Sequence, residues 1–253
     1  MLLLILFFAA AFGLLSFLEA SHPRQSYPPV KRWRAKGVLA FAAYLVIGGA
    51  APFIWDGFLA EHRLFDARGW PLPVQIGAGF FIAELFGYAW HRMMHQTPFL
   101  WRWFHQMHHS AERVDLSGAF WFSPLDTIGF AFMGSLALIG VMGVSAVAGL
   151  AINIAIMLLT MWQHLNVKTP RWLGYFIVRP ESHSKHHERG RHRLNYCDLP
   201  LIDMIFGTFN NPNDIVRQAG FYDGASQRVG DMLLGRDVAG PARPATCALA
   251  PAE

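Results

Sequence analysis

The chain has few charged residues and almost no cysteine. Of its 253 residues, 15% are charged and 53% are hydrophobic, and the mean hydropathy is +0.27. A soluble protein cannot expose so much apolar surface to water, so the composition predicts an integral membrane protein. The two cysteines, Cys197 and Cys247, lie far apart in the sequence. This separation excludes a disulfide framework and a zinc site of the Cys-x-x-Cys type.

Motifs that bind phosphate or carry electrons are also missing. The sequence has no Gly-x-Gly-x-x-Gly or Walker-type loop and no repeat at solenoid spacing. It also has no cytochrome b5-like domain, flavin motif or ferredoxin-type set of cysteines. The net charge of +4 predicts no nucleic-acid partner, because the Lys and Arg residues of a membrane protein collect in its cytoplasmic loops.

Several apolar stretches are long enough to cross a bilayer, which needs roughly 20 residues as a helix. Residues 1–18, 37–55 and 73–90 each predict one span. Residues 128–162 would form a helix of about 52 Å, so we expect two shorter spans that turn near 143–146. Residues 1–18 resemble a signal peptide but lack a basic segment, so we expect this stretch to be retained. The prediction is therefore four or five spans.

Basic residues indicate which side of the membrane each loop occupies. Residues 24–36 carry five basic side chains and no acid, whereas residues 56–72 mix both signs. By the positive-inside rule, both histidine-rich regions and the carboxyl end face the cytoplasm, in a bacterial inner membrane or an endoplasmic reticulum. We divide the chain into amino-terminal spans (1–72), a histidine-rich domain (73–212) and an extension (213–253). We expect residues 236–253 of this extension to be a disordered tail.

Histidines are concentrated beside the predicted spans. Eight of the twelve form three groups with ligand-like spacing, namely His91 with His95, His105 with His108 and His109, and His183 with His186 and His187. Members of each group share one helical face. His164 ends the last apolar stretch and is the ninth candidate ligand, whereas we expect His22, His62 and His192 to be bystanders. Imidazole suits zinc, copper, nickel and iron. Because nine ligands exceed the needs of one tetrahedral ion, the pattern predicts two metal ions.

Two further residues lie on the helical face of His91 and His95. Glu84 and Tyr88 precede His91 by seven and three residues, inside the last turns of a span. An ionised carboxylate is costly there and is usually functional. We expect Glu84 to accept the free ring N–H of a ligating histidine and thereby fix its orientation. The alternative is a protonated Glu84 that binds a neighbouring helix.

These motifs resemble the membrane fatty acid hydroxylase/sterol desaturase superfamily. The resemblance covers roughly residues 80–212 and rests on Glu84-x-x-x-Tyr88-x-x-His91-Arg92-x-x-His95, Leu100-Trp101-x-x-x-His105-x-x-His108-His109-Ser110, Gln163-His164-x-Asn166, Pro180-x-x-His183-x-x-His186-His187, Asn195-Tyr196 and Asp203-x-x-Phe206-Gly207-Thr208-Phe209. It implies an all-α, multi-pass transmembrane bundle with a cytosolic, histidine-rich helical cap.

The resemblance also implies the chemistry. It indicates two non-haem iron ions held by the nine histidines, with Asn195 supporting them. Dioxygen would be the co-substrate, and a membrane lipid such as a sterol or a fatty acyl chain would be hydroxylated. Electrons would come from a cytochrome b5-like protein or from a ferredoxin with its reductase. Desaturation by the same centre remains an alternative, and a histidine-rich metal transporter and a di-haem cytochrome are readings from other classes.

The sequence departs from the family pattern in two places. Lys168 stands where some members carry another histidine, so Asn166 or water is expected to complete that site. Residues 121–126 (Trp-Phe-Ser-Pro-Leu-Asp) also differ from the usual segment after the second group of histidines. We expect this segment to shape the substrate end of the site, so the sequence does not predict the particular lipid or carbon.

Overall fold

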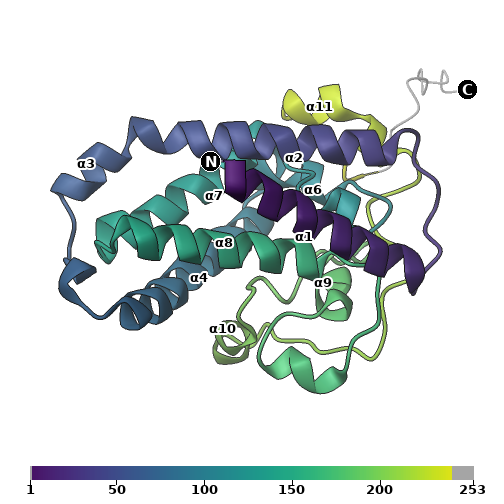
Figure 1. Ribbon diagram of the computed structural model, residues 1–253. Coiled ribbons are helices and arrows are strands. Elements are labelled where there is room, and N and C mark those ends of the chain that lie inside the picture. The colour runs from purple at the N-terminus through teal and green to yellow at the C-terminus, as the bar shows by residue number, and fades with distance from the viewer. Residues whose placement is uncertain (1, 241–253) are drawn as a thin grey trace, which may run out of the picture.

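Residues 2–240 are described by a computed structural model and form helices joined by loops. Within this range there is no β-strand, and the isolated bridge between Glu188 and Ala219 is the one β-type pairing. The predicted all-α class is therefore confirmed. One end of the molecule is a bundle of long helices and the other end is a cap of short helices and loops (Figure 1).

Four helices of the described chain are long and apolar enough to span a membrane. They are α2 (Trp33–Ala50) with its continuation η1 (Ala51–Ile54), α4 (Leu72–Gln96), α7 (Pro124–Ser135) with its continuation η5 (Leu136–Val141), and α8 (Ala146–Gln163). Much of their surface is exposed apolar side chain, as expected for helices whose solvent is lipid. The short helices α3 (Asp56–Glu61) and η2 (Ala67–Gly69) connect α2 to α4 at the end far from the cap (Figure 1).

The long apolar stretch before His164 is a hairpin, as predicted. η5 ends at Val141 and α8 begins at Ala146, after the cap residue Ser145. Gly143 adopts φ +58°, a left-handed conformation that glycine tolerates without a steric penalty. A Cβ at this position would also collide with the carbonyl oxygen of Phe65 in the neighbouring loop. The turn therefore depends on glycine for two separate reasons.

The first helix, α1 (Leu2–Ser21), is displaced along the bundle toward the cap (Figure 1). Its Phe8 and Phe12 pack with Phe41 of α2 and with α8, so α1 closes one side of the bundle. The carboxylate of Glu19 accepts hydrogen bonds from the backbone N–H groups of Leu116 and Asn166, at 3.0 and 2.8 Å. The end of α1 is thus fixed to the cap, and a fifth span formed by α1 stays a prediction.

The cap consists of short helices that follow the spans α4 and α8. These are α5 (Pro98–Leu100), η3 (Trp101–His105, a π-helix), α6 (Gln106–His109), η4 (Leu116–Gly118), η6 (Arg171–Tyr175), α9 (Pro180–His186), α10 (Pro200–Ile205), η7 (Ala225–Gln227) and α11 (Val229–Leu233). Most are too short to be stable alone, so their positions depend on tertiary contacts.

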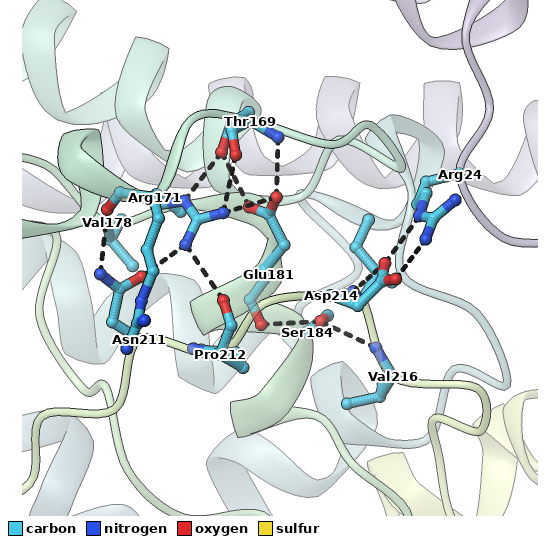
Figure 2. A network of polar contacts seen from close by, with 12 residues as sticks. Arg24, Thr169, Arg171, Val178, Glu181, Ser184, Asn211, Pro212, Asp214 and Val216 are labelled. Carbon is cyan, nitrogen blue, oxygen red and sulfur yellow. Dashed lines mark hydrogen bonds and ion pairs between the residues drawn. The ribbon is translucent and has the colours of Figure 1, made fainter.

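A buried ion pair fixes α9 within the cap. Arg179 is 1% exposed, and its guanidinium lies 2.7 Å from Glu181 and donates to the carbonyl of Thr169 at 2.8 Å. Glu181 in turn accepts hydrogen bonds from the backbone and the hydroxyl of Thr169 (Figure 2). Asn211 binds the other side of Arg179. Because an unpaired charge at such depth costs several kcal/mol, removing either partner would release the start of α9.

The predicted disordered tail is wrong for its first residues. Val238 is fully buried, and its N–H donates to the side-chain oxygen of Gln106 at 3.2 Å. The amide of Gln106 donates to the carbonyl of Arg236 at 2.8 Å. The Gly- and Ala-rich composition suggested disorder, but these backbone groups find a partner in the cap. The rest of the predicted tail, residues 241–253, lies outside the described residues.

We expect Gly143→Ala to lower the free energy of unfolding by about 1–2 kcal/mol or more, because a left-handed conformation costs alanine about that much. Gly149→Ala is the matched control, since a Cβ there meets only Val144, at an ordinary 3.9 Å, within a helix. Thermal unfolding in detergent, followed by tryptophan fluorescence, would compare the two. Equal stability of both variants would contradict the proposed strain.

Candidate metal centre

The nine predicted ligands come together in two groups at the junction of bundle and cap. The five-histidine group contains His91, His95, His105, His109 and His186, and the four-histidine group contains His108, His164, His183 and His187. Within each group one ligand atom per residue lies within 4.8 Å of all the others. His95 is partly exposed, and the other eight side chains are buried. Each cluster of the cap, His105–His109 and His183–His187, therefore contributes to both groups.

In the five-histidine group, every ring except that of His95 has its Nδ1 atom in contact with a polar neighbour. His91 Nδ1 binds the carbonyl of Tyr196 at 2.8 Å, and His186 Nδ1 binds the carbonyl of Leu194 at 2.7 Å. A carbonyl only accepts, so Nδ1 carries the proton in both rings and Nε2 keeps its lone pair. All five Nε2 atoms are buried without a hydrogen-bond partner among the described residues. Buried polar atoms normally have partners, so this set fits a cation.

The four-histidine group also fits a cation, as the distances between its ring nitrogens indicate. His164 Nε2 lies 3.3 Å from His108 Nε2 and 3.0 Å from His183 Nε2, and His187 Nε2 lies 3.1 Å from His183 Nε2. His164 Nδ1 donates to the carbonyl of Thr160 at 2.7 Å, so its Nε2 has only a lone pair. Nitrogen atoms about 2.1 Å from one metal ion lie about 3.0–3.4 Å from their neighbours. The residues present therefore fit a metal ion here too.

Burial keeps the rings of the cap in the neutral form that binds metal. Loss of hydration lowers the pKa of His164 from 6.5 to about 4. Burial, followed by repulsion from neighbouring histidines, lowers the pKa of His108 and His183 well below 6.5. Burial likewise lowers the pKa of the remaining cap ligands, His105, His109, His186 and His187. At neutral pH these rings need not lose a proton before they bind a cation.

Asp126 is a site residue that the sequence analysis missed. Its Oδ2 accepts a hydrogen bond from His105 Nδ1 at 2.8 Å, and both side chains are buried. It lies in the first turn of α7, whose N-cap Ser123 accepts a hydrogen bond from its backbone N–H. A carboxylate in this position fixes the ring and makes its Nε2 a better donor to metal. The departure of residues 121–126 from the family pattern predicts a role at the substrate end, and no ligand-like spacing indicates Asp126.

His192 is a second correction, since the sequence analysis treated it as a solvated bystander. Its Nδ1 lies 3.1 Å from Nδ1 of His109, and its ring packs 5.2 Å from the ring of Phe221. Burial lowers the pKa of His192 to about 4. The neutral ring of His192 thus contacts Nδ1 of the candidate ligand His109, the nitrogen that does not face the metal group. Its neighbours Arg191 and Arg193 are exposed, which is why the sequence suggested a solvated loop.

The segment that contains His192 is held in an unusual backbone conformation. His192, Leu194 and Asn195 have φ values of 46°, 73° and 49°, in the left-handed region that is unfavourable for residues other than glycine. This path directs His192 toward His109 and the carbonyl of Leu194 toward His186. Asn195 stabilises it by donating to the carbonyl of Ser182 at 2.8 Å and accepting from the N–H of Asn210 at 2.7 Å. Asn195 therefore supports the ligands through the backbone.

The expected contact between Glu84 and a histidine ring is wrong. Glu84 Oε2 instead accepts hydrogen bonds from the N–H groups of Asp198 and Leu199, at 3.0 and 3.2 Å, and from the thiol of Cys197. Seven residues separate Glu84 from His91, about 10 Å along a helix, which is beyond the reach of the carboxylate. Glu84 holds the segment that follows Tyr196, whose carbonyl binds His91. Its influence on the ligand is therefore indirect.

Tyr88 also contacts the segment that follows Asn195, through Thr208 and Asp203. Its hydroxyl lies 3.0 Å from Oγ1 of Thr208, and Thr208 donates to Asp203. The carboxylate of Asp203 accepts hydrogen bonds from the backbone N–H groups of Tyr196 and Cys197, at 2.9 and 3.0 Å. Glu84 and Tyr88 on α4 thus fix residues 196–199 from opposite ends, which sets the position of the Tyr196 carbonyl.

Neither protein side chain considered for completing the His164 site reaches it. Asn166 uses its side chain to bind the backbone of Gln25, at 2.9 and 2.7 Å. Lys168 is exposed. The four-histidine group therefore has fewer protein ligands than its neighbour.

Comparison with known proteins agrees with this geometry. A family model described as "Fatty acid hydroxylase" matches residues 76–208, which is more than half of the chain and includes all nine candidate ligands. The chain belongs to the fatty acid hydroxylase family. The predicted resemblance is thereby confirmed, and the four apolar helices agree with the integral membrane protein that this family suggests.

Curated relatives of this fatty acid hydroxylase family member act on lipids. Ornithine lipid hydroxylase OlsE of Rhizobium tropici is 30% identical over 158 residues, covering 61% of this chain and 47% of that protein. Alkylglycerol monooxygenase of Homo sapiens is 35% identical over 170 residues, covering 65% of this chain and 36% of that protein. The Danio rerio enzyme of the same name is 33% identical over 171 residues, with coverage of 65% and 36%.

The matched part of the chain spans less than half the length of each of these relatives. No solved structure matches the chain. The family and the hydroxylase and monooxygenase relatives together support an oxidoreductase.

We expect Asp126→Ala to weaken metal retention about 10–100-fold, because loss of an outer hydrogen-bond partner typically has this effect. Asp126→Asn should retain more metal, since its amide oxygen can still accept the bond from His105. Asp223→Ala, at a side chain that is 75% exposed, is the control. Metal content after dialysis against a chelator measures the effect. Wild-type retention by Asp126→Ala would remove this residue from the site.

We expect His183→Ala to reduce metal content from about two ions per chain to about one, because the four-histidine group has no spare protein ligand. The five-histidine group should stay loaded. His22→Ala, at an exposed residue, is the control. Mass spectrometry of the purified, membrane-inserted protein gives the stoichiometry. Two ions retained by His183→Ala would show that this histidine is not a ligand.

Proposed function

We propose that this protein is a membrane-bound di-iron oxygenase that hydroxylates a C–H position of a membrane lipid. The observation that carries the proposal is the pair of buried imidazole groups where the spans meet the cap. Two iron ions held there would activate dioxygen with electrons from an external donor and oxidise an unactivated C–H bond. The same centre could also desaturate a lipid, and that outcome is distinguished by the experiment below.

The candidate ligands are compatible with iron and include no charged side chain. All nine candidate ligand atoms belong to imidazoles, which suit iron, zinc, copper and nickel. Five ring nitrogens in one group exceed the four that a structural zinc site uses, so the five-histidine group favours an ion of higher coordination number. The family to which the chain belongs favours iron among the metals that imidazole accepts.

Aromatic side chains give the centre an apolar wall on the bundle side. Phe122 packs 4.5 Å from His108, and Phe130 of α7 packs 6.0 Å from His91, as ring-centroid distances. Both side chains are partly exposed, so they lie between the ligands and the surface rather than in the core. Tyr44 of α2 lies 6.1 Å from Phe122 and continues this wall along the bundle. An acyl chain could approach along this wall without meeting water.

A membrane lipid is the proposed class of substrate. The wall formed by Tyr44, Phe122 and Phe130 suits a hydrocarbon chain, and the curated relatives are named for an ornithine lipid and an alkylglycerol. These names belong to the relatives, and the particular lipid of this chain is left open in the proposal. The residues that bind and position the chain would be apolar, while the histidines and their partners would hold the metals in place.

The proposed orientation places the cap in the cytoplasm. Most basic residues of the chain lie in the loops at the cap end of the spans, whereas the far loop carries Arg63 and Arg68 together with acids. The positive-inside rule assigns the basic side to the cytoplasm. An electron-transfer protein, such as a cytochrome b5-like protein or a ferredoxin with its reductase, would then reach the cap from the cytosol.

The decisive experiment compares the lipids of cells with and without the gene, and of cells that carry His108→Ala instead. We expect at least one lipid to gain 16 mass units only with the wild-type protein. A loss of 2 mass units in place of this gain would identify a desaturase. No wild-type-dependent change in any lipid, with iron present in the purified protein, would contradict both activities.

A further inference from the structure

Six large apolar side chains of the cap are exposed and lie close together. They are here called the apolar shelf and comprise Trp172, Tyr175 and Phe176 at η6 and Leu201, Ile205 and Phe206 at α10, with exposed fractions between 48% and 66%. η6 and α10 are in contact with each other. Exposed apolar patches of this kind mark interaction surfaces rather than ordinary protein surface. None of the six belongs to the four candidate spans or contributes a ligand to the metal groups.

The shelf packs directly against the span α4. Phe206 stacks on Tyr88 of α4, with ring centroids 5.0 Å apart, and Ile202 and Leu199 pack in one cluster with Tyr88 and Leu85. The side chain of Trp162, in the last turn of α8, donates to the carbonyl of Val178 at 2.9 Å, two residues beyond Phe176. Both parts of the shelf are therefore attached to spans.

The position along α4 gives the depth of the shelf. α4 has 25 residues and is about 37 Å long, which exceeds a hydrocarbon core of about 30 Å. Tyr88 lies eight residues before the end of this helix, about 12 Å along its axis. The contact between α10 and α4 thus falls near the boundary of the hydrocarbon core and not in the water beyond it. Figure 1 agrees, since α10 lies beside the bundle and not beyond the cap end of α8.

Basic side chains flank the shelf at the level expected for lipid phosphates. Arg171 is exposed at the start of η6, and Arg92 lies one turn beyond Tyr88 on α4 and donates to its hydroxyl at 2.7 Å. Arginine and aromatic residues at the edge of an apolar surface are typical of the membrane interface. We propose that the apolar shelf is a membrane-contacting surface that inserts into the headgroup–acyl boundary of the same bilayer that the spans cross.

With the shelf inserted, one side of the cap would contact lipid instead of being surrounded by water. The shelf is formed by the residues before α9 and after Asn195, so its contact with lipid would fix the depth of the segments that hold His183 and His186. The proposal depends on the spans but not on the identity of the metal or the reaction.

Spin-label accessibility in liposomes of phosphatidylcholine and phosphatidylglycerol tests the proposal with the full chain. On a Cys247→Ser background, with Cys197 buried, nitroxides would be attached to Ile205→Cys and Phe176→Cys. Phe81→Cys on the exposed face of α4 is the reference for lipid, and Gln218→Cys, exposed beside Arg217 in the cap, is the reference for water. Metal content and a single peak in size-exclusion chromatography confirm that each labelled variant is folded.

We expect both shelf labels to collide with oxygen rather than with a water-soluble nickel chelate, at a ratio severalfold above that of Gln218→Cys and close to that of Phe81→Cys. A ratio equal to that of Gln218→Cys would overturn the proposal, because the shelf would then face water. Suppression of both collision rates would also overturn it, since a second copy or another protein would then cover the shelf.

Discussion

The whole structure depends on holding nine neutral imidazole rings with their lone pairs directed at two points. Such lone pairs repel one another, and each buried ring nitrogen without a partner carries a desolvation cost of about 1–3 kcal/mol. The fold meets this requirement in four of the rings by fixing the outer nitrogen: carbonyls of Thr160, Leu194 and Tyr196 and the carboxylate of Asp126 each take one ring N–H. In these four rings the proton is confined to the outer side, and the inner side is left for a cation.

The position of these acceptors explains other polar groups that are buried far from any ligand. Glu84 and Asp203 bind the backbone of residues 196–199. The side chain of Asn195 binds the carbonyl of Ser182 and the N–H of Asn210. Arg179 and Glu181 fix the start of α9, which carries the candidate ligands His183 and His186. The strained φ values at 192–195 belong to the same system, because a relaxed loop would not direct both His192 and the Leu194 carbonyl inward. Backbone position, rather than direct contact, is how these residues act on the metal groups.

The sequence predicted the all-α bundle, the hairpin at residue 143 and all nine histidines, because hydrophobic length and ligand spacing are local properties. It could not predict how the histidines divide. His105, His108 and His109 were expected on one face, but α6 is a single turn that follows a π-helix, and His108 joins the group opposite its two neighbours. Asp126 and His192 were missed because each meets a ligand only through tertiary packing, across 21 and 83 residues. Glu84 was predicted to be a functional carboxylate inside a span, but its partner, the backbone N–H of Asp198, lies more than a hundred residues later.

The end of the spans is the place where this centre can meet its opposing requirements. The metal groups need neutral, water-poor surroundings, which α4, α7 and α8 supply at their cap ends, and they need backbone carbonyls that no lipid-exposed helix could leave free. The loop at Leu194 and Tyr196 and the last turn of α8 at Thr160 provide those carbonyls, and such free backbone groups are tolerated only where the chain leaves the hydrocarbon core. On the proposed function, a lipid arrives through the core and electrons arrive through water. A centre deeper in the bundle would be closed to the electron donor, and one farther out in the cap would be closed to the lipid. The boundary position follows from both needs, and the apolar shelf beside α4 would hold the cap at that depth.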